Sequence, residues 1–266
     1  MQVTIAPASN KTSTAAIRSL LSQNPKVQVK GLYRDLKKVP DEFSSTGNFT
    51  AVQGDVGDVN TLDFSGSDAV LMVLPPAYDG RDIVEHAKRI SNNVKTAIER
   101  AGSVGRLVLL SSVGAEFSEG VTIKGPNPFF FSTITPLDFN IAMVAIKDIG
   151  EALATQLTRD WTPPSKPYIM ELRGPEPYSP LDVQKAFSRA LGKNVEIKAV
   201  EKEDLAEFYG KIFAPQIVNE WVEMSTCFLP GGIAEKNLSK PSDVDVIYGR
   251  TTLTEALREA TAELRK

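Results

Sequence analysis

The stretch that decides the fold is residues 1–21, MQVTIAPASNKTSTAAIRSLL. Its first six residues form a short β-rich run, and residues 7–10, Pro-Ala-Ser-Asn, are typical turn formers. From Thr12 onward the apolar residues recur at helical spacing, at positions 15, 16, 17, 20 and 21. The stretch therefore predicts a strand, a tight turn and a helix, which is the opening unit of an α/β sheet.

The pattern repeats along the first half of the chain. Four further β-rich runs follow, at residues 27–33 (VQVKGLY), 49–53 (FTAVQ), 67–74 (SDAVLMVL) and 106–111 (RLVLLS). A long helix is predicted at residues 81–101 and ends at Gly102, a residue that suits the left-handed cap position. Strands that alternate with helices predict right-handed βαβ units, and hence a doubly wound, Rossmann-like parallel sheet covered on both faces.

The alternation stops after the fifth predicted strand. Residues 113–140 contain Gly, Pro, Ser and three consecutive phenylalanines (129–131), but no amphipathic helix. A parallel strand needs a crossover connection before the next parallel strand, and long structureless loops are uncommon inside compact domains. Two interpretations stay open: the segment is an unusual lid, or the chain lacks a crossover helix and strand here.

Regular patterns resume at residue 142. Asp148 and Glu151 form a start signal for a helix at residues 149–157, and Ser179 before Pro180 predicts another helix that ends at Gly192. Strands are predicted at 166–172 and 195–200, and helices at 203–213, 215–227 and 252–264, the last opened by a capping box of Thr252 and Glu255. We expect a dinucleotide-binding type of domain at residues 1–158 and a smaller α+β portion at residues 159–266 that lies on the substrate side.

The bulk composition excludes several function classes. The chain has 266 residues, of which 42% are hydrophobic and 24% are charged, as in ordinary globular proteins. A net charge of −3 and a pI near 5.4 argue against binding to nucleic acid. We find no apolar run long enough to span a bilayer and no signal peptide, and the single Cys227 excludes an intrachain disulfide and a cysteine metal cluster. We expect no metal, no membrane and a cytoplasmic location.

The turn after the first strand is where such sheets meet a pyrophosphate. Glycines are favoured at three places there, and this chain has Pro7, Asn10 and Ser13 instead. Asn tolerates left-handed backbone geometry better than most residues, whereas Pro fixes φ and removes an N–H donor. The turn alone is therefore an ambiguous indication of cofactor binding.

Two interpretations of this turn are equally good. The backbone amides of Asn10, Lys11 and Thr12, together with the Thr12 hydroxyl, can meet a phosphate, and Lys11 adds positive charge. In the other interpretation Ser9 or Thr12 is merely a helix cap.

A basic segment directly follows the second predicted strand. It contains Arg34, Lys37 and Lys38. An acidic residue at this strand end would take the ribose hydroxyls of NAD, whereas an arginine accommodates the 2′-phosphate of NADP. The position favours NADP(H) slightly over the alternative of a solvated basic loop.

An ordered set of segments resembles the NmrA-like group of atypical short-chain dehydrogenase/reductases. The matching segments are VTIAPASNKTSTAAIRSLL (3–21), GLYRD (31–35), VQGDVGD (52–58), GSDAVLMVLPP (66–76), RLVLLSSVGAE (106–116), MVAIKDIGEALA (143–154) and ELRGPEPYSPLDVQKAFSRALGK (171–193). The sequence departs from the family in two ways. The three turn glycines are replaced, and about one βα unit, on the order of 30 residues, is missing after Gly120.

The resemblance implies a set of site residues. Those expected at the cofactor are Ser9, Asn10, Lys11, Thr12, Arg34, Asp55, Pro75, Pro76 and Ser111, and those expected at the substrate are Ser112, Tyr78 and Phe130. A serine at the end of the fifth strand can hold a substrate carbonyl, but we expect no Tyr-x-x-x-Lys pair anywhere in the chain to serve as its partner. No catalytic residue is therefore assigned. The only histidine, His86, is expected midway along the helix at 81–101, in a surface or packing role.

Three functions fit the resemblance and the departures from it. The first is an NADP(H)-dependent oxidoreductase that acts on a small, largely apolar organic substrate. The second is a non-enzymatic redox sensor or regulator that binds NADP and acts through a protein partner. The third, suggested by the missing glycines, is a cofactor-free isomerase or cyclase on the same scaffold.

Overall fold

The computed structural model describes residues 1–110, 121–122, 128–232, 235 and 245–263 of the chain. Contacts divide it into two compact units. The first comprises residues 1–77, 81–111 and 146–166, and the second comprises residues 78–80, 112–145 and 167–266. This division differs from the single predicted boundary after residue 158, because strands at 129–132 and 141–142 pair with later strands of the second unit.

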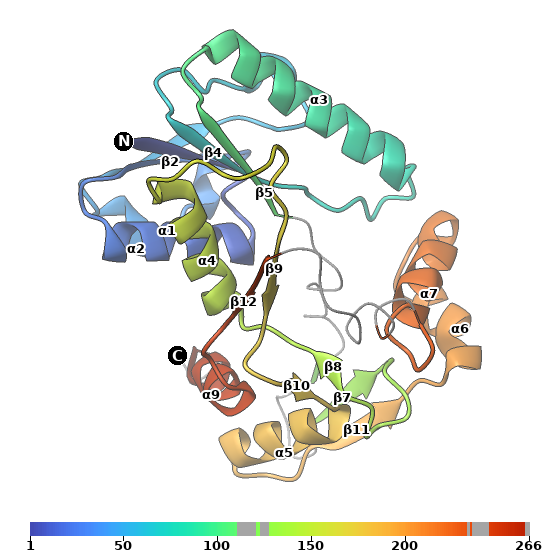
Figure 1. Cartoon of the computed structure of the whole chain (residues 1–266). Helices are drawn as coiled ribbons and strands as arrows, with labels where there is room; N and C mark the ends of the chain where they lie inside the picture. The colour runs from blue at the N-terminus through green and yellow to red at the C-terminus, as the bar shows by residue number, and fades with distance from the viewer. Residues whose placement is uncertain (111–120, 123–127, 233–234, 236–244, 264–266) are drawn as a thin grey trace. The chain divides into compact units, whose positions relative to one another are not determined.

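The first unit is built on one parallel sheet. Its strands are β1 (Gln2–Ala6), β2 (Gln28–Tyr33), β3 (Phe49–Gln53), β4 (Ala69–Val73) and β5 (Arg106–Leu110). They lie in the order β3-β2-β1-β4-β5, and every neighbouring pair is parallel (Figure 1). The predicted doubly wound, Rossmann-like fold is confirmed.

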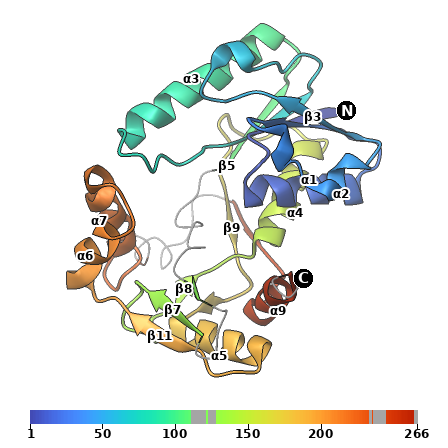
Figure 2. The ribbon, with the colours of Figure 1, turned by 180° about the vertical axis from the view of Figure 1, so that it is seen from behind.

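Helices cover both faces of this sheet. They are α1 (Lys11–Gln23), α3 (Ile83–Ala101) and α4 (Ile146–Thr158), with the short elements η1 (Leu36–Lys38), α2 (Asp41–Ser44) and η2 (Val59–Thr61). Figures 1 and 2 show α3 on one face and α1 and α4 side by side on the other. Gly150 of α4 permits this close packing, since a Cβ added there would lie 2.6 Å from the backbone of Ala15.

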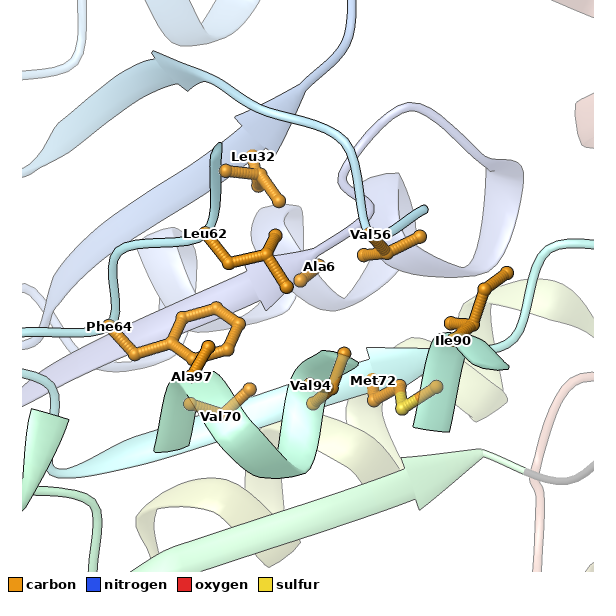
Figure 3. Close-up of a cluster of buried hydrophobic side chains, with 10 residues drawn as sticks. All are labelled: Ala6, Leu32, Val56, Leu62, Phe64, Val70, Met72, Ile90, Val94 and Ala97. Atoms are coloured by element: carbon orange, nitrogen blue, oxygen red, sulfur yellow. The ribbon is translucent and has the colours of Figure 1, made fainter. Parts of the chain in front are cut away.

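The core between the sheet and α3 follows from the two sequence periods. Figure 3 shows it, with α3 contributing three residues that share one face of the helix, Ile90, Val94 and Ala97. The other buried members are Ala6, Leu32, Val56, Leu62, Phe64, Val70 and Met72. Burial of these side chains holds α3 over β1, β2 and β4.

One strand lacks the cover that its neighbour has. By register, Leu107 and Leu109 of β5 lie beside Val70 and Met72 of β4, on the face of the sheet that carries α3. The two β4 side chains are buried, whereas Leu107 and Leu109 are 50% and 57% exposed. A crossover helix following β5 would cover this strip, which agrees with the βα unit that is missing from the sequence.

Helix caps in the first unit match the sequence in part. Gly102 ends α3 with φ of 64°, as predicted. Asp82 caps the start of α3, so His86 lies in the first helical turn, and its predicted place midway along the helix is wrong. The predicted start of the next helix is also wrong, because α4 begins at Ile146 and Asp148 is a buried residue inside its first turn.

The end of α4 is closed by an arginine from the sheet. The guanidinium of Arg106 donates to the carbonyl oxygens of Gln156, Leu157 and Arg159, at 3.1, 3.2 and 2.7 Å. Carbonyls in the last turn of a helix have no partner inside the helix, and they carry partial negative charge. Arg106 therefore satisfies the end of α4 and joins it to β5.

The described residues of the second unit form three small sheets and several helices. Its strands are β6 (Val121–Thr122), β7 (Phe129–Ser132), β8 (Ile141–Ala142), β9 (Met170–Arg173), β10 (Pro177–Tyr178), β11 (Glu196–Ala199) and β12 (Asp245–Tyr248). Its helices are α5 (Pro180–Leu191), η3 (Lys202–Asp204), α6 (Leu205–Gly210), η4 (Pro215–Ile217), α7 (Val218–Thr226) and α9 (Leu253–Glu263). β11 pairs with β7 in parallel, β12 pairs with β9 in parallel, and β6–β7 and β8–β10 are antiparallel.

Two capping signals in the second unit are confirmed. Ser179 and Asp182 form a reciprocal capping box at α5, which ends at Gly192 with φ of 65°. At α9, Glu255 accepts from the backbone of Thr252, whose hydroxyl accepts from the Glu255 backbone. Local side-chain chemistry therefore fixes both helix starts.

One buried hydroxyl in the first unit is unsatisfied. Tyr33, at the end of β2, is fully buried, and its hydroxyl has no hydrogen-bond partner among the described residues. Burial raises the pKa of the Tyr33 hydroxyl to about 12, because the phenolate would lose its hydration. An unpaired buried hydroxyl costs folding free energy.

We expect Arg106→Met to lower the free energy of unfolding by about 2 kcal/mol, because several carbonyls lose a charged donor. Urea unfolding of the full chain, followed by circular dichroism, measures this change. Lys95→Met is the matched control: Lys95 is an exposed lysine on α3 whose pair with Glu99 spans 3.8 Å, and its loss should change stability by less than about 0.5 kcal/mol. Equal stability of the two variants would contradict the role given to Arg106.

We expect Tyr33→Phe to raise the free energy of unfolding by about 1 kcal/mol at pH 7, since an unpaired hydroxyl is removed from the core. Between pH 10 and about 12 the unfolded chain ionises Tyr33 while the folded chain keeps it protonated, so the stability of the parent falls. The stabilising effect of Tyr33→Phe should therefore increase across this range. Tyr248→Phe, at a tyrosine that is 63% exposed, is the control and should show neither effect.

Candidate cofactor-binding edge of the sheet

The turn between β1 and α1 is closed by side chains. Asn10 caps α1 with φ of −83°, and its side-chain oxygen accepts from the Ser13 backbone N–H at 2.7 Å. The Ser13 hydroxyl donates to the Pro7 carbonyl at 2.7 Å, and the Asn10 amide group donates to the same carbonyl at 3.3 Å. No described residue other than glycine has a positive φ, so this turn needs no left-handed residue. Side-chain hydrogen bonds thus close this turn, whereas other turns of this kind rely on glycines.

The residue that caps α1 differs from the two that the sequence predicts. Ser9 or Thr12 was expected to cap the helix, but Asn10 does so, as its high rank among capping residues allows. The Thr12 hydroxyl was expected to be available to a phosphate. It donates instead to the Asn10 side chain at 2.7 Å, so its proton is already used inside the turn.

Backbone donors remain at the start of α1. Within the described part of the chain, the N–H groups of Ser9, Lys11 and Thr12 have no acceptor. No acidic residue lies in the first turn of α1, and the side chains of Ser9 and Lys11 are exposed. Free N–H groups at a helix N-terminus, with a lysine and no carboxylate, suit an anionic group.

Hydrogen bonds bring three strand ends together. The Ala8 N–H donates to the Leu32 carbonyl at 2.8 Å, which fixes the turn against the end of β2. The Gly54 N–H donates to the Tyr33 carbonyl at 2.9 Å, which fixes the end of β3 beside it. The carboxyl edge of the sheet therefore joins the turn, the segment after β2 and the segment after β3, as expected for a nucleotide site.

Arg34 lies at this edge with its side chain exposed. Its carbonyl accepts from the Gln53 side chain at 3.3 Å, and no acceptor for its guanidinium is found among the described residues. Asp35, the next residue, is also exposed, and its carboxylate caps η1 by accepting from the Lys37 N–H at 3.0 Å. Arg34 is therefore an exposed cation beside the end of β2, with no described acceptor for its guanidinium.

Asp55 has a structural role in its loop. Its carboxylate accepts from the Gly57 N–H at 2.8 Å, and its backbone bonds to the Thr61 hydroxyl. The preceding Gly54 is needed for close packing, because a Cβ there would lie 2.6 Å from the Leu32 side chain. Asp55 thus shapes the loop after β3, at the same edge as the turn.

The remaining expected residues are placed as follows. Pro75 and Pro76 follow β4, the neighbour of β1, and are half-buried and exposed respectively. Tyr78 belongs to the second unit, and so does Phe130, which is buried against Phe187 with ring centroids 5.9 Å apart. Ser111 and Ser112 lie outside the described residues.

One catalytic pattern occurs in the sequence at a place where it cannot act. Tyr33 and Lys37 have the Tyr-x-x-x-Lys spacing, so the expectation that the chain contains no such pair is wrong. Tyr33 is fully buried at the end of β2, so its hydroxyl meets no substrate.

In the part of the chain that the structure describes, no group of three or more His, Cys, Asp or Glu side chains can hold a metal ion, and no helix has the length and apolar character of a membrane span.

We expect Asn10→Ala to lower the free energy of unfolding by about 1 kcal/mol, because the Ser13 N–H loses its acceptor. Asn10→Ser keeps an oxygen at the cap and should stay within a few tenths of a kcal/mol of the parent. Thermal and urea unfolding of both variants measures the difference. If Asn10→Ala were as stable as the parent, the turn would not depend on this cap.

Comparison with known proteins agrees with this geometry. A family model described as NAD(P)H-binding matches residues 8–159, which contain the turn from Ala8 onward, Arg34, Asp55, Pro75 and Pro76. A comparison with curated protein sequences gives no match.

Solved structures with the same fold cover nearly the whole chain. Triphenylmethane reductase from Citrobacter sp., complexed with NADP(H), is 17% identical, with a TM-score of 0.65 over 98% of this chain and 100% of that chain. NmrA, a negative transcriptional regulator, is 15% identical, with a TM-score of 0.63 over 99% of this chain and 96% of that one. The NADPH-dependent quinone oxidoreductase QOR2 from Escherichia coli, complexed with NADPH, is 16% identical, with a TM-score of 0.55 over 98% and 100%.

At these identities the solved structures show the fold, and the family model shows the family. The family model spans more than half of the chain. NmrA, whose group the sequence segments resemble, is among the solved structures with this fold. The chain is therefore a member of the NAD(P)H-binding family with a Rossmann-like fold.

Proposed function

We propose that this protein binds NADP(H) at the carboxyl edge of its parallel sheet and reduces a small, largely apolar organic acceptor. The observation that carries the proposal is the turn after β1, where free N–H groups at the start of α1 lie at the same sheet edge as the exposed Arg34. The names of two fold neighbours, a reductase and a quinone oxidoreductase, support reduction as the reaction.

Each part of the cofactor has a set of residues that fits it. The N–H groups of Ser9, Lys11 and Thr12 suit the pyrophosphate, and the Lys11 side chain adds charge. Arg34 suits the 2′-phosphate that distinguishes NADP from NAD. Pro75 and Pro76, after β4, are the residues proposed on the nicotinamide side.

The cofactor supplies the hydride when it is bound, so the protein must chiefly hold and orient both reactants. Asn10 and Ser13 contribute by closing the turn around the Pro7 carbonyl, which fixes the direction of the free N–H groups. No Tyr-x-x-x-Lys pair follows β5 in the sequence, so the proposal includes no proton donor of that type. Ser111 and Ser112 stay proposals as cofactor and substrate contacts.

A calorimetric titration with NADPH and then with NADH tests the proposal. We expect NADPH to bind more tightly, and Arg34→Ala to lower its affinity about tenfold or more, because a charged hydrogen bond to phosphate is lost. NADH affinity should not change in Arg34→Ala, since NADH has no 2′-phosphate.

Lys26→Ala is the matched control for this titration. Lys26 is an exposed lysine just before β2, at the opposite end of the strand from Arg34, so its loss removes one charge away from the proposed site. NADPH affinity should be unchanged in this variant. If neither nucleotide bound the parent protein, the oxidoreductase proposal would fail and a cofactor-free isomerase or cyclase would become the better candidate.

A regulator that binds NADP without turnover is the second candidate. It is favoured by the lack of a Tyr-x-x-x-Lys pair after β5 and by the likeness in fold to NmrA, a negative transcriptional regulator. Oxidation of NADPH, followed at its absorbance maximum with a panel of small apolar acceptors, separates the two. Tight NADPH binding without turnover of any acceptor favours the regulator.

A further inference from the structure

Six aromatic side chains of the second unit form one continuous series of ring contacts. Neighbouring ring centroids in the series are between 4.3 and 6.1 Å apart. The residues, in the order of contact, are Phe131, Phe208, Tyr209, Phe213, Trp221 and Tyr78. They come from β7, α6, the segments next to η4, α7 and the loop after β4.

The rings at one end of this series are nearly parallel. Phe213 and Trp221 stack with centroids 4.3 Å apart and an interplanar angle of 9°. Tyr78 makes angles of 9° with Phe213 and 18° with Trp221, at 6.1 Å from each. The other contacts in the series are tilted or edge-on, as is common in aromatic cores. Tyr78, Phe213 and Trp221 are called the ring platform below.

Two neighbouring parts of the second unit contact the ring platform: Tyr209 and the loop that contains Gly80. Tyr209, which contacts both Phe213 and Trp221, is buried, and its hydroxyl is hydrogen-bonded to the Ser225 hydroxyl at 2.5 Å. Gly80, with φ of +83°, lets the loop that carries Tyr78 pack on η4, since a Cβ there would lie 3.0 Å from the Gln216 side chain. The ring platform therefore packs on a buried, hydrogen-bonded tyrosine and on η4.

The ring platform is open to solvent where Tyr78 lies. Tyr78 is 47% exposed, and Phe213 and Trp221 are half-buried. An aromatic ring that is ordered by stacking and yet exposed leaves apolar area in water, which is unfavourable unless a ligand covers it. Small-molecule sites are lined predominantly by apolar and aromatic side chains, and the ring platform supplies side chains of this kind.

We infer that the ring platform binds a flat, conjugated ring of an uncharged organic ligand. Parallel aromatic faces favour a further planar ring by offset stacking, whereas a puckered saturated ring touches them poorly. Naming this ligand as the acceptor rests on the proposed function, in which the acceptor is a small, largely apolar organic molecule.

Calorimetric titration of the full chain with 2-naphthol and with decahydro-2-naphthol tests the inference. The two probes share a carbon skeleton and a hydroxyl, but only 2-naphthol is flat and conjugated. We expect 2-naphthol to bind about fivefold more tightly or better, and Tyr78→Leu to weaken its binding about fivefold, because stacking is lost while apolar area is kept. Tyr78→Phe should bind it within about twofold of the parent, since the ring is retained.

Tyr248→Leu is the matched control, because Tyr248 is an exposed tyrosine of the same unit that makes no ring contact among the described residues. It should bind 2-naphthol as the parent does. Equal affinity for the two probes, an unchanged affinity in Tyr78→Leu, or no binding of 2-naphthol up to millimolar concentration would overturn the inference.

The same variants keep this test separate from that of the proposed function. Neither probe is reduced by NADPH, so their binding does not depend on turnover. NADPH affinity of Tyr78→Leu should equal that of the parent. If the parent protein prefers 2-naphthol but does not bind NADPH, the proposed function alone is contradicted. If it binds NADPH but shows no preference for 2-naphthol, the inference about the ring platform alone is contradicted.

Discussion

The carbonyl of Pro7 is the acceptor on which the nucleotide-type edge of this protein depends. It receives hydrogen bonds from the Ser13 hydroxyl and the Asn10 side chain, and Asn10 in turn accepts from the Ser13 backbone. These bonds hold a turn in which proline, asparagine and serine stand at three places where glycine is favoured. Since Asn10 has a φ of −83°, the turn keeps its function as a helix start without left-handed geometry. Glycine turns of this kind depend on the backbone freedom of glycine, whereas this turn is held by side-chain hydrogen bonds.

On one face of the sheet, α4 is fixed by close packing on α1 and by hydrogen bonds from β5. The glycine that permits tight contact with α1 lies in α4, where Gly150 approaches the backbone of Ala15. Arg106 then joins the end of α4 to β5 through three carbonyls. The helix on this face is thus well anchored, whereas the opposite face of β5 exposes Leu107 and Leu109. The uncovered strip marks the place where a crossover helix after β5 would lie.

The chemistry proposed for the protein is divided between its two units. As proposed, amides and an arginine of the first unit bind an anionic cofactor, and stacked rings of the second unit bind an apolar ligand. Hydride transfer requires close, water-free placement of the two reactants more than it requires an acid–base pair. A protein that lacks the Tyr-x-x-x-Lys pair after β5 therefore remains suited to reduction, and equally to binding NADP as a signal.

The sequence by itself determined the parallel sheet, the caps at Gly102 and Ser179, the capping box at Thr252 and the basic residue after β2, because each follows from local periodicity or side-chain chemistry. It did not determine which side chain caps α1, since Ser9, Asn10 and Thr12 are all capable and only the folded turn selects one. Nor did it determine that Tyr33 is fully buried, because burial is a property of the whole sheet. The ring platform depended most on tertiary structure: stacking joins Tyr78 to Trp221 across more than half of the chain, and no local pattern encodes such a contact.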